Sequence, residues 1–184
     1  MQKVVVLGST GSIGVNTLDV MGMHPESFQV FALTAATRVD ALFAQCLQHK
    51  PRFAVMAEAD SGRALKERCA AAGLAVEVLW GAQAIADMAG HLDVDTVMAA
   101  IVGAAGLVPT LAAAKAGKRV LLANKEALVM SGNLFMQAMK AGGGELLPID
   151  SEHNAIFQCL PAQFTKTSAD HLGVEELWLT ASGG

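Results

Sequence analysis

The stretch Val4–Gly14 near the N-terminus reads VVVLGSTGSIG, a short apolar run that breaks into three glycines spaced three apart. The apolar run predicts a buried strand, and the residues from about Ser12 predict a helix directly after it. A helix N-terminus presents free N–H groups and a positive dipole end, and glycines let a ligand approach the backbone closely. The stretch therefore predicts a phosphate-binding turn. The alternative is a tight turn, capped by a Ser or Thr side chain, that serves only the fold.

The rest of the chain repeats this alternation of strand and helix. Helical spacing of apolar residues follows the expected strands, with further helices beginning at about Arg38 and Asp60. Many strands are apolar at consecutive positions, which is typical of a parallel sheet buried on both faces. These features predict a doubly wound, mostly parallel α/β fold of the Rossmann type. The six further strands are expected at Gln29–Leu33, Phe53–Met56, Val76–Trp80, Val94–Ala100, Arg119–Leu122 and Glu145–Ile149.

The rhythm changes after LLPIDSEHNA, which begins at Leu146. We therefore expect one nucleotide-binding domain over residues 1–149 and the beginning of a second, catalytic α+β domain over residues 150–184. The chain ends in LWLTASGG, which we interpret as a strand followed by two glycines. A natural domain end is usually tied down more firmly, so we expect the chain to be a fragment.

Composition excludes several classes of partner. Of 184 residues, 53% are hydrophobic and 16% charged, which predicts a large core and little disorder. The net charge is −4 and no long run of Lys and Arg occurs, which argues against nucleic acid or an anionic membrane as partner. The segment 96–114 is uncharged, but Gly103, Gly106 and Pro109 interrupt it. We interpret it as a buried strand that runs into a glycine-rich turn, not as a membrane span.

The cysteines and the N-terminus indicate a cytoplasmic protein. Cys46, Cys69 and Cys159 are odd in number and form no CxxC pair, as expected of free thiols in a reducing compartment. The apolar run before Gly8 has only four residues, too few for the core of a signal peptide.

The glycines Gly8, Gly11 and Gly14 form a GxxGxxG spacing variant of the dinucleotide fingerprint. Ser9, Thr10 and Ser12 add hydroxyl groups that we expect to serve as donors to phosphate.

The end of the second strand distinguishes between two dinucleotides. An NAD site usually has an acidic residue there. This chain instead reads LTAATR at residues 33–38, with no acidic residue and with one arginine, Arg38. A guanidinium pairs well with a 2′-phosphate, so the sequence favours NADP. The alternative for Arg38 is a solvated residue at a helix start.

The polar group Asn124-Lys125-Glu126 follows an expected strand within VLLANKEALV. Open α/β sheets bind ligands at this end of their strands. Lys125 could place a positive charge near a substrate oxygen, and Asn124 could bond a cofactor amide or ribose. The alternative is an Asn cap on an exposed first helical turn.

A second polar group, Asp150-Ser151-Glu152-His153, also ends a strand. Its two carboxylates can converge on one hard cation such as Mg²⁺ or Mn²⁺, with water, substrate or a distant ligand completing the shell. For His153 we favour a structural or outer-shell role over that of a base or third ligand. The alternative for the whole group is a capped helix with an acidic first turn.

With these residues in view, the whole chain resembles the 1-deoxy-D-xylulose 5-phosphate reductoisomerase family. The resemblance rests on five motifs that stand in the family's order: GSTGSIG at 8–14, AAIVGAAGL at 99–107, LLANKEALV at 121–129, DSEHNAIFQCL at 150–160 and LTASGG at 179–184.

The resemblance implies NADPH-dependent and divalent-metal-dependent (Mn²⁺, Mg²⁺ or Co²⁺) rearrangement and reduction of a phosphorylated sugar, 1-deoxy-D-xylulose 5-phosphate. It implies a homodimer whose subunit is about twice as long as this chain. This chain alone should therefore not convert the substrate. One departure is Ala36-Thr37-Arg38 where the family usually has Gly-Lys-Asn. The implied NADPH contacts are Thr10, Gly11, Ser12, Ile13, Asn124 and Glu126, the implied substrate contacts Lys125, Ser151, Glu152 and Ser182, and the implied metal ligands Asp150 and Glu152.

Three other functions fit parts of the pattern. A semialdehyde-dehydrogenase type of reductase also has a glycine-rich first turn, but no cysteine here lies in a recognisable nucleophile context. A dinucleotide-sensing module without catalysis would use the acids at 150 and 152 only as a helix cap. An inert fragment would bind nothing.

Overall fold

Seven parallel strands form one sheet in the order β4-β3-β2-β1-β5-β6-β7. The computed structural model describes residues 1–123, 125–161 and 173–180. This order confirms the predicted doubly wound fold, because the chain moves outward from β1 in one direction and then in the other. The strands are β1 (Gln2–Leu7), β2 (Phe28–Ala35), β3 (Phe53–Met56), β4 (Glu77–Trp80), β5 (Thr96–Ala99), β6 (Arg119–Leu122) and β7 (Glu145–Pro148).

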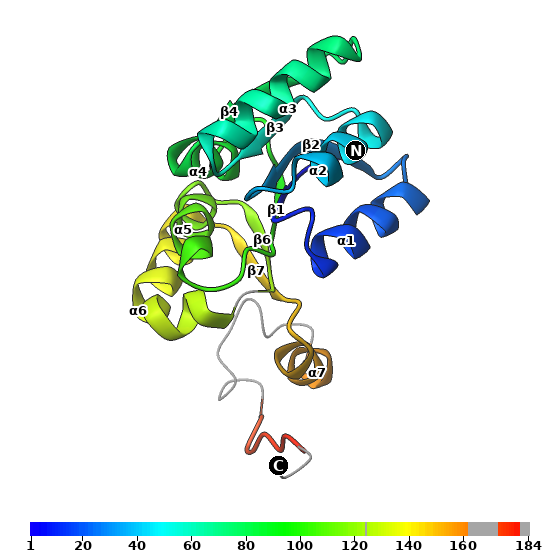
Figure 1. The fold of residues 1–184 in the computed structure, drawn as a ribbon. Coiled ribbons are helices and arrows are strands. Elements are labelled where there is room, and N and C mark those ends of the chain that lie inside the picture. The colour runs from blue at the N-terminus through cyan, green and yellow to red at the C-terminus, as the bar shows by residue number, and fades with distance from the viewer. Residues whose placement is uncertain (124, 162–172, 181–184) are drawn as a thin grey trace.

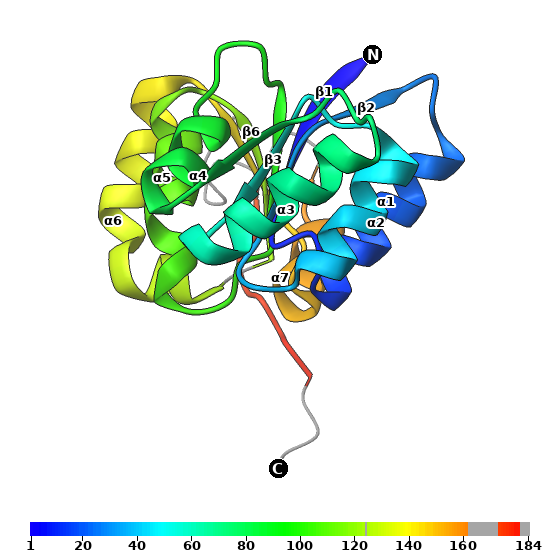
Figure 2. The same ribbon diagram turned by 45° about the horizontal axis from the view of Figure 1, so that its top comes forward.

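Helices cover both faces of the sheet (Figures 1 and 2). One layer holds α1 (Ser12–Met23), α2 (Val39–His49) and α3 (Ala59–Ala71), and the opposite layer holds α4 (Ala82–Ala89), α5 (Leu107–Lys115) and α6 (Lys125–Gly142). A short 3-10 turn, η1 (Ala104–Gly106), precedes α5, and α7 (Ser151–Cys159) follows β7.

Strand β1 shows why the strands are apolar at every position. Val4 and Val6 pack into the core shared with α1, α2 and α3, whereas Val5 and Leu7 pack into the core shared with α4, α5 and α6. Alternate side chains of a strand point to opposite faces, so a strand covered on both sides needs apolar residues throughout. Burial of each such side chain contributes about 1.5–3 kcal/mol.

Helix α6 bends at Ser131, whose φ of −143° and ψ of 22° are not helical. The Ser131 hydroxyl donates to the carbonyl of Ala127 at 2.7 Å, and Gly132 follows. A neighbouring Ser and Gly are a common cause of a kink. The bend separates the first turns of α6, which carry Lys125 and Glu126, from the longer part that packs on the sheet.

The uncharged segment 96–114 forms β5, η1 and most of α5, as expected for a strand that runs into a glycine-rich turn. Among the described residues, no helix has the length and apolar character needed to cross a membrane.

The expected last strand is wrong. Residues 174–180 have no regular secondary structure, and Leu177, Trp178 and Leu179 are exposed. A strand needs a partner to bond its backbone, and none of the described strands pairs with this segment.

Candidate functional site

The predicted site residues that the structure describes lie at the carboxyl edge of the sheet, around the point where the strand order reverses. This point lies between β1 and β5, which pair with each other while β2 lies on the other side of β1. The loops after β1, β2, β6 and β7 all begin at this edge (Figure 1). Ligands of open α/β sheets bind at such a switch point.

Two of the three glycines in the β1 loop are required by the protein itself. Gly8 has a φ of +74°, and a Cβ there would lie 2.9 Å from the carbonyl oxygen of Ala100 after β5. A Cβ on Gly14 would lie 2.5 Å from the carbonyl oxygen of Gly8. The backbone therefore passes very close to its neighbours at both glycines. A larger residue at either position would force the loop away from α1 or from the segment after β5.

Gly11 differs from its neighbours because the protein has no steric need for it. Its φ of −81° suits any residue, and a Cβ would meet only the Gly8 carbonyl oxygen, at 3.4 Å. Gly11 is exposed at the N-cap of α1, where no described side chain caps the helix. The first N–H groups of a helix have no partner within it. The position beside them is therefore open to an anionic ligand that comes close to the backbone.

Ser9 does not have the role expected of it. Its side chain is fully buried, and its hydroxyl lies 2.7 Å from Oε1 of Gln45 and 3.1 Å from the carbonyl oxygen of Thr34. The expectation that Ser9 donates to a phosphate is wrong, because its only hydroxyl hydrogen is used inside the protein. Thr10 is half-buried and Ser12 is exposed, so their hydroxyls lie nearer the surface.

Thr34 and Gln45 were not predicted, yet they fix the loop. The Thr34 hydroxyl accepts from the Gly8 N–H at 2.9 Å, and its carbonyl accepts from the Ser9 N–H at 2.8 Å. Gln45 of α2 also donates from Nε2 to the Ser9 carbonyl at 2.8 Å. Two features of the sequence could have identified them. Thr34 places a hydroxyl near the end of a buried strand, and Gln45 places an amide next to the buried Cys46 of α2.

Arg38 lies beside the glycine loop. It is the N-cap residue of α2, and its exposed guanidinium donates to the carbonyl of Thr10 at 3.2 Å. The strand before it, β2, ends at Ala35, and Ala36 and Thr37 are exposed. A guanidinium at this position suits a dianionic group on the adenosine half of a dinucleotide bound along the loop.

The β6 and β7 ends meet through an ion pair. Lys125 Nζ lies 3.3 Å from Asp150 Oδ2, and this pairing raises the pKa of Lys125. Asp150 is the N-cap residue of α7, and its backbone carbonyl accepts from the Asn154 N–H at 2.8 Å. Glu126 is exposed beside Lys125. Asn124 lies outside the described residues.

Asp150 has the chemistry of an incomplete cation site. Its Oδ1 atom is buried and accepts no hydrogen bond from a described residue, while Nδ1 of His153 lies 3.6 Å away. A hydrogen bond with Glu152 and then the neighbouring Lys125 lower the pKa of Asp150, although partial burial opposes them. The group is therefore an ionised carboxylate with one oxygen atom left without a donor.

The other members of the acidic turn lie on its surface. Ser151, Glu152 and His153 are exposed, and the Ser151 hydroxyl donates to Glu152 Oε2 at 3.0 Å. Within residues 1–123, 125–161 and 173–180, no three His, Cys, Asp or Glu side chains gather closely enough to hold a metal. Two carboxylates fit part of a hard-cation shell, and further oxygen ligands would be needed. Ser182 lies outside the described residues.

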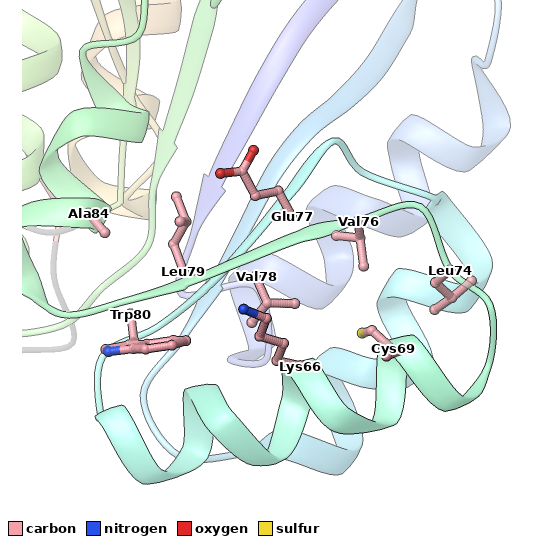
Figure 3. Close-up of a pocket in the computed structure, with 10 residues that line it drawn as sticks. Lys66, Cys69, Leu74, Val76, Glu77, Val78, Leu79, Trp80 and Ala84 are labelled. Carbon is pink, nitrogen blue, oxygen red and sulfur yellow. The ribbon is translucent and has the colours of Figure 1, made fainter.

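An open pocket of about 490 Å³ lies elsewhere, between α3 and the edge strand β4 (Figure 3). Val78 and Trp80 face α3 across it, and Cys69 lines it from the helix. None of the predicted site residues lines this pocket. It has few polar groups to orient a ligand, so the switch point remains the candidate site.

Comparisons with known proteins show which family the chain resembles over its length. Residues 4–132 match the family 1-deoxy-D-xylulose 5-phosphate reductoisomerase, and residues 146–184 match the C-terminal domain of 1-deoxy-D-xylulose 5-phosphate reductoisomerase. Proteins of that name from Pseudomonas fluorescens and Aromatoleum aromaticum are each 59% identical over the whole chain. The chain spans 46% and 45% of their lengths, respectively.

A crystal structure of DOX-P reductoisomerase in complex with NADPH, fosmidomycin and magnesium superimposes with a TM-score of 0.89 and 47% identity. The match covers 93% of this chain and 42% of that one. The fold, the order of the motifs and the two family matches agree over nearly the whole sequence. The chain belongs to the 1-deoxy-D-xylulose 5-phosphate reductoisomerase family.

Proposed function

We propose that this chain is the cofactor-binding part of an enzyme that converts 1-deoxy-D-xylulose 5-phosphate to 2-C-methyl-D-erythritol 4-phosphate with NADPH and a divalent cation. The observation that carries the proposal is the meeting of two unlike features at one sheet edge. An anion-accepting glycine loop follows β1, and a carboxylate with an oxygen that accepts no hydrogen bond from a described residue follows β7. The chain spans about half of its relatives, so we assign turnover to the full-length protein and expect none from this chain alone.

NADPH would bind along the loop after β1. The N–H groups at the start of α1 would receive the pyrophosphate, and Arg38 would face the 2′-phosphate from the start of α2. Support comes from the open backbone at Gly11 and from the contact of Arg38 with Thr10. The proposed cofactor residues are Gly8, Thr10, Gly11, Ser12, Ile13, Gly14, Arg38, Asn124 and Glu126.

The cation would bind Asp150 and Glu152. Carboxylate oxygens suit Mg²⁺, Mn²⁺ and Co²⁺, and a related crystal structure contains magnesium. When bound, the cation would polarise the substrate's ketone and NADPH would supply the hydride. Lys125 neutralises Asp150 in the present arrangement, and it would lie next to the substrate together with Ser151, Glu152 and Ser182.

For the full-length protein we propose a cytoplasmic homodimer whose ligand is a small phosphorylated sugar. We place the boundary between the nucleotide-binding and catalytic domains between residues 149 and 150. The first family match ends at residue 132 and the second begins at residue 146, which supports a division in this region.

A titration of this chain with NADPH and with NADH tests the cofactor assignment. We expect saturable binding that favours NADPH, and Arg38→Ala should weaken NADPH binding about tenfold while leaving NADH unchanged, since only NADPH has the 2′-phosphate. A cooperative thermal transition serves as the control for folding. If a folded chain binds neither nucleotide, the proposal fails; equal binding of both would remove the role of Arg38.

A further inference from the structure

We propose that Gln45 is a positioning residue of the dinucleotide loop, which holds the loop in its ligand-accepting form without touching the ligand. This inference rests on the nucleotide-binding function proposed above. Gln45 contacts Ser9 at two points, accepting from its hydroxyl at 2.7 Å and donating to its carbonyl at 2.8 Å. The two contacts join residues 36 positions apart in the chain.

The contacts consume the polar groups of Ser9 that could otherwise turn toward the loop's open side. The Ser9 carbonyl and hydroxyl are bonded inward by Gln45, and its N–H is bonded inward by the Thr34 carbonyl. With every polar group of Ser9 bonded within the protein, the first N–H groups of α1, which have no partner inside the helix, remain as donors for a ligand. A donor array fixed before binding costs less to order when a phosphate arrives.

Helix α2 and its N-cap residue contact two consecutive residues of the loop, Ser9 and Thr10. Arg38 contacts Thr10, and Gln45, seven positions later, contacts Ser9. Residues seven apart lie on the same face of a helix, two turns from each other. Helix α2 and its N-cap residue, Arg38, therefore set the position of the pyrophosphate loop and of the guanidinium beside it.

Loss of Gln45 and loss of Arg38 should affect NADPH and NADH binding differently. Gln45 acts on the part of the site shared by NADPH and NADH, so its loss should weaken both by a similar factor. Arg38 acts on the part unique to NADPH. We expect Gln45→Met, which keeps the chain length but removes both hydrogen bonds, to raise both dissociation constants about tenfold.

The experiment measures nucleotide affinity and amide hydrogen exchange in the unsubstituted chain, Gln45→Met and the matched control Gln48→Met, an exposed position on the same helix. Exchange at residues 8–12 should accelerate in Gln45→Met, with the protection of β3 unchanged, and the control should match the unsubstituted chain. Ser9→Ala should weaken binding alone but add little in the Gln45→Met background, because the two side chains act through one another.

Unchanged loop exchange and unchanged affinities in Gln45→Met would overturn the inference. Full additivity of Ser9→Ala and Gln45→Met in affinity would overturn it as well. If Gln45→Met does not fold, Gln45→Glu replaces it, since the carboxylate keeps an acceptor for the Ser9 hydroxyl but loses the donor to the carbonyl. A folded parent chain that binds neither nucleotide would refute the proposed function, while the exchange measurement would still decide the role of Gln45.

Discussion

The loop after β1 and the acidic turn after β7 lie at the same edge of the sheet, but the chain holds them in different ways. The glycine loop is fixed from three directions, by Thr34 of β2, Gln45 of α2 and Ala100 after β5. The acidic turn has one partly buried carboxylate, Asp150, which lies 3.3 Å from Nζ of Lys125 and 3.6 Å from Nδ1 of His153. The rest of the turn is exposed.

We interpret the difference as a preformed loop for the proposed nucleotide and only part of the proposed cation site. A preorganised loop needs little rearrangement when its ligand arrives. A pair of carboxylates, only one of which pairs with a lysine in the described residues, needs further ligands before it can hold a cation firmly. Substitutions in the first region should therefore affect binding by this chain, and substitutions in the second should affect turnover by the full-length enzyme.

Gly14→Ala should have the largest effect. The added Cβ would lie 2.5 Å from both the Gly8 carbonyl oxygen and the Ser9 Cα, and the backbone would have to move. We expect a loss of about 3 kcal/mol in the free energy of unfolding, the upper end for overpacking, and no measurable NADPH binding. Urea unfolding and nucleotide titration check this; Gly22→Ala in the same helix, where a Cβ meets nothing within 4 Å, is the control. Equal stability of the two variants would contradict the close packing of loop and helix.

Asp150→Asn in the full-length enzyme should come second. The substitution removes the charge that attracts the cation while keeping a side chain of the same shape. We expect turnover at limiting Mn²⁺ to fall about 100-fold, with NADPH affinity unchanged because the glycine loop does not contact this residue. The test measures steady-state turnover across a Mn²⁺ titration and, separately, the affinity for NADPH. Normal turnover at limiting metal would show that Asp150 is not a ligand.

Gly11→Ala should have a smaller and more selective effect. Its Cβ would meet only the Gly8 carbonyl oxygen, at 3.4 Å, so the free energy of unfolding should change by less than about 1 kcal/mol. The same methyl group would stand where we propose that the backbone meets the pyrophosphate, and NADPH affinity should fall about tenfold. Calorimetric binding and thermal unfolding are measured on the same sample. Unchanged affinity would mean that the phosphate does not approach this glycine.

Sequence reasoning succeeded where the signal is local. The strand at Val4–Leu7, the helix after Ser12 and the three glycines lie next to one another in the chain, and periodicity reveals them. It also placed Lys125 and Asp150 at the same sheet edge, because each follows a parallel strand.

It failed where the outcome depends on a distant contact. Ser9 has the same hydroxyl as Ser12, and only the folded chain brings Gln45 within reach to occupy it. The ion pair of Lys125 with Asp150 likewise depends on β6 and β7 being neighbours. The apolar residues at 177–179 predicted a strand, but intrinsic preference forms no strand without a partner.

His49 provides the finest test of the comparison, because it lies at the far end of the helix that supports the glycine loop. Burial lowers its pKa below the ordinary 6.5, and Asp19 of α1 only partly offsets this. The unfolded chain therefore binds a proton more readily than the folded chain. The stability that depends on neutral His49 is fully present above pH 6.5 and is lost as the pH falls below 6.5 toward the folded pKa.

Hydrogen exchange at pH 7.5 and just below pH 6 locates this loss. We expect protection of α2 to fall with pH in the unsubstituted chain and to stay level in His49→Gln, which cannot take up the proton. Both proteins should show the same response in β7, which packs at the opposite end of the sheet order and serves as the internal reference. A fall in α2 protection that persists in His49→Gln would assign the acid sensitivity to another group. A fall confined to α2 and absent from the variant would tie the stability of the loop's supporting helix to one half-buried imidazole, independently of the acidic turn.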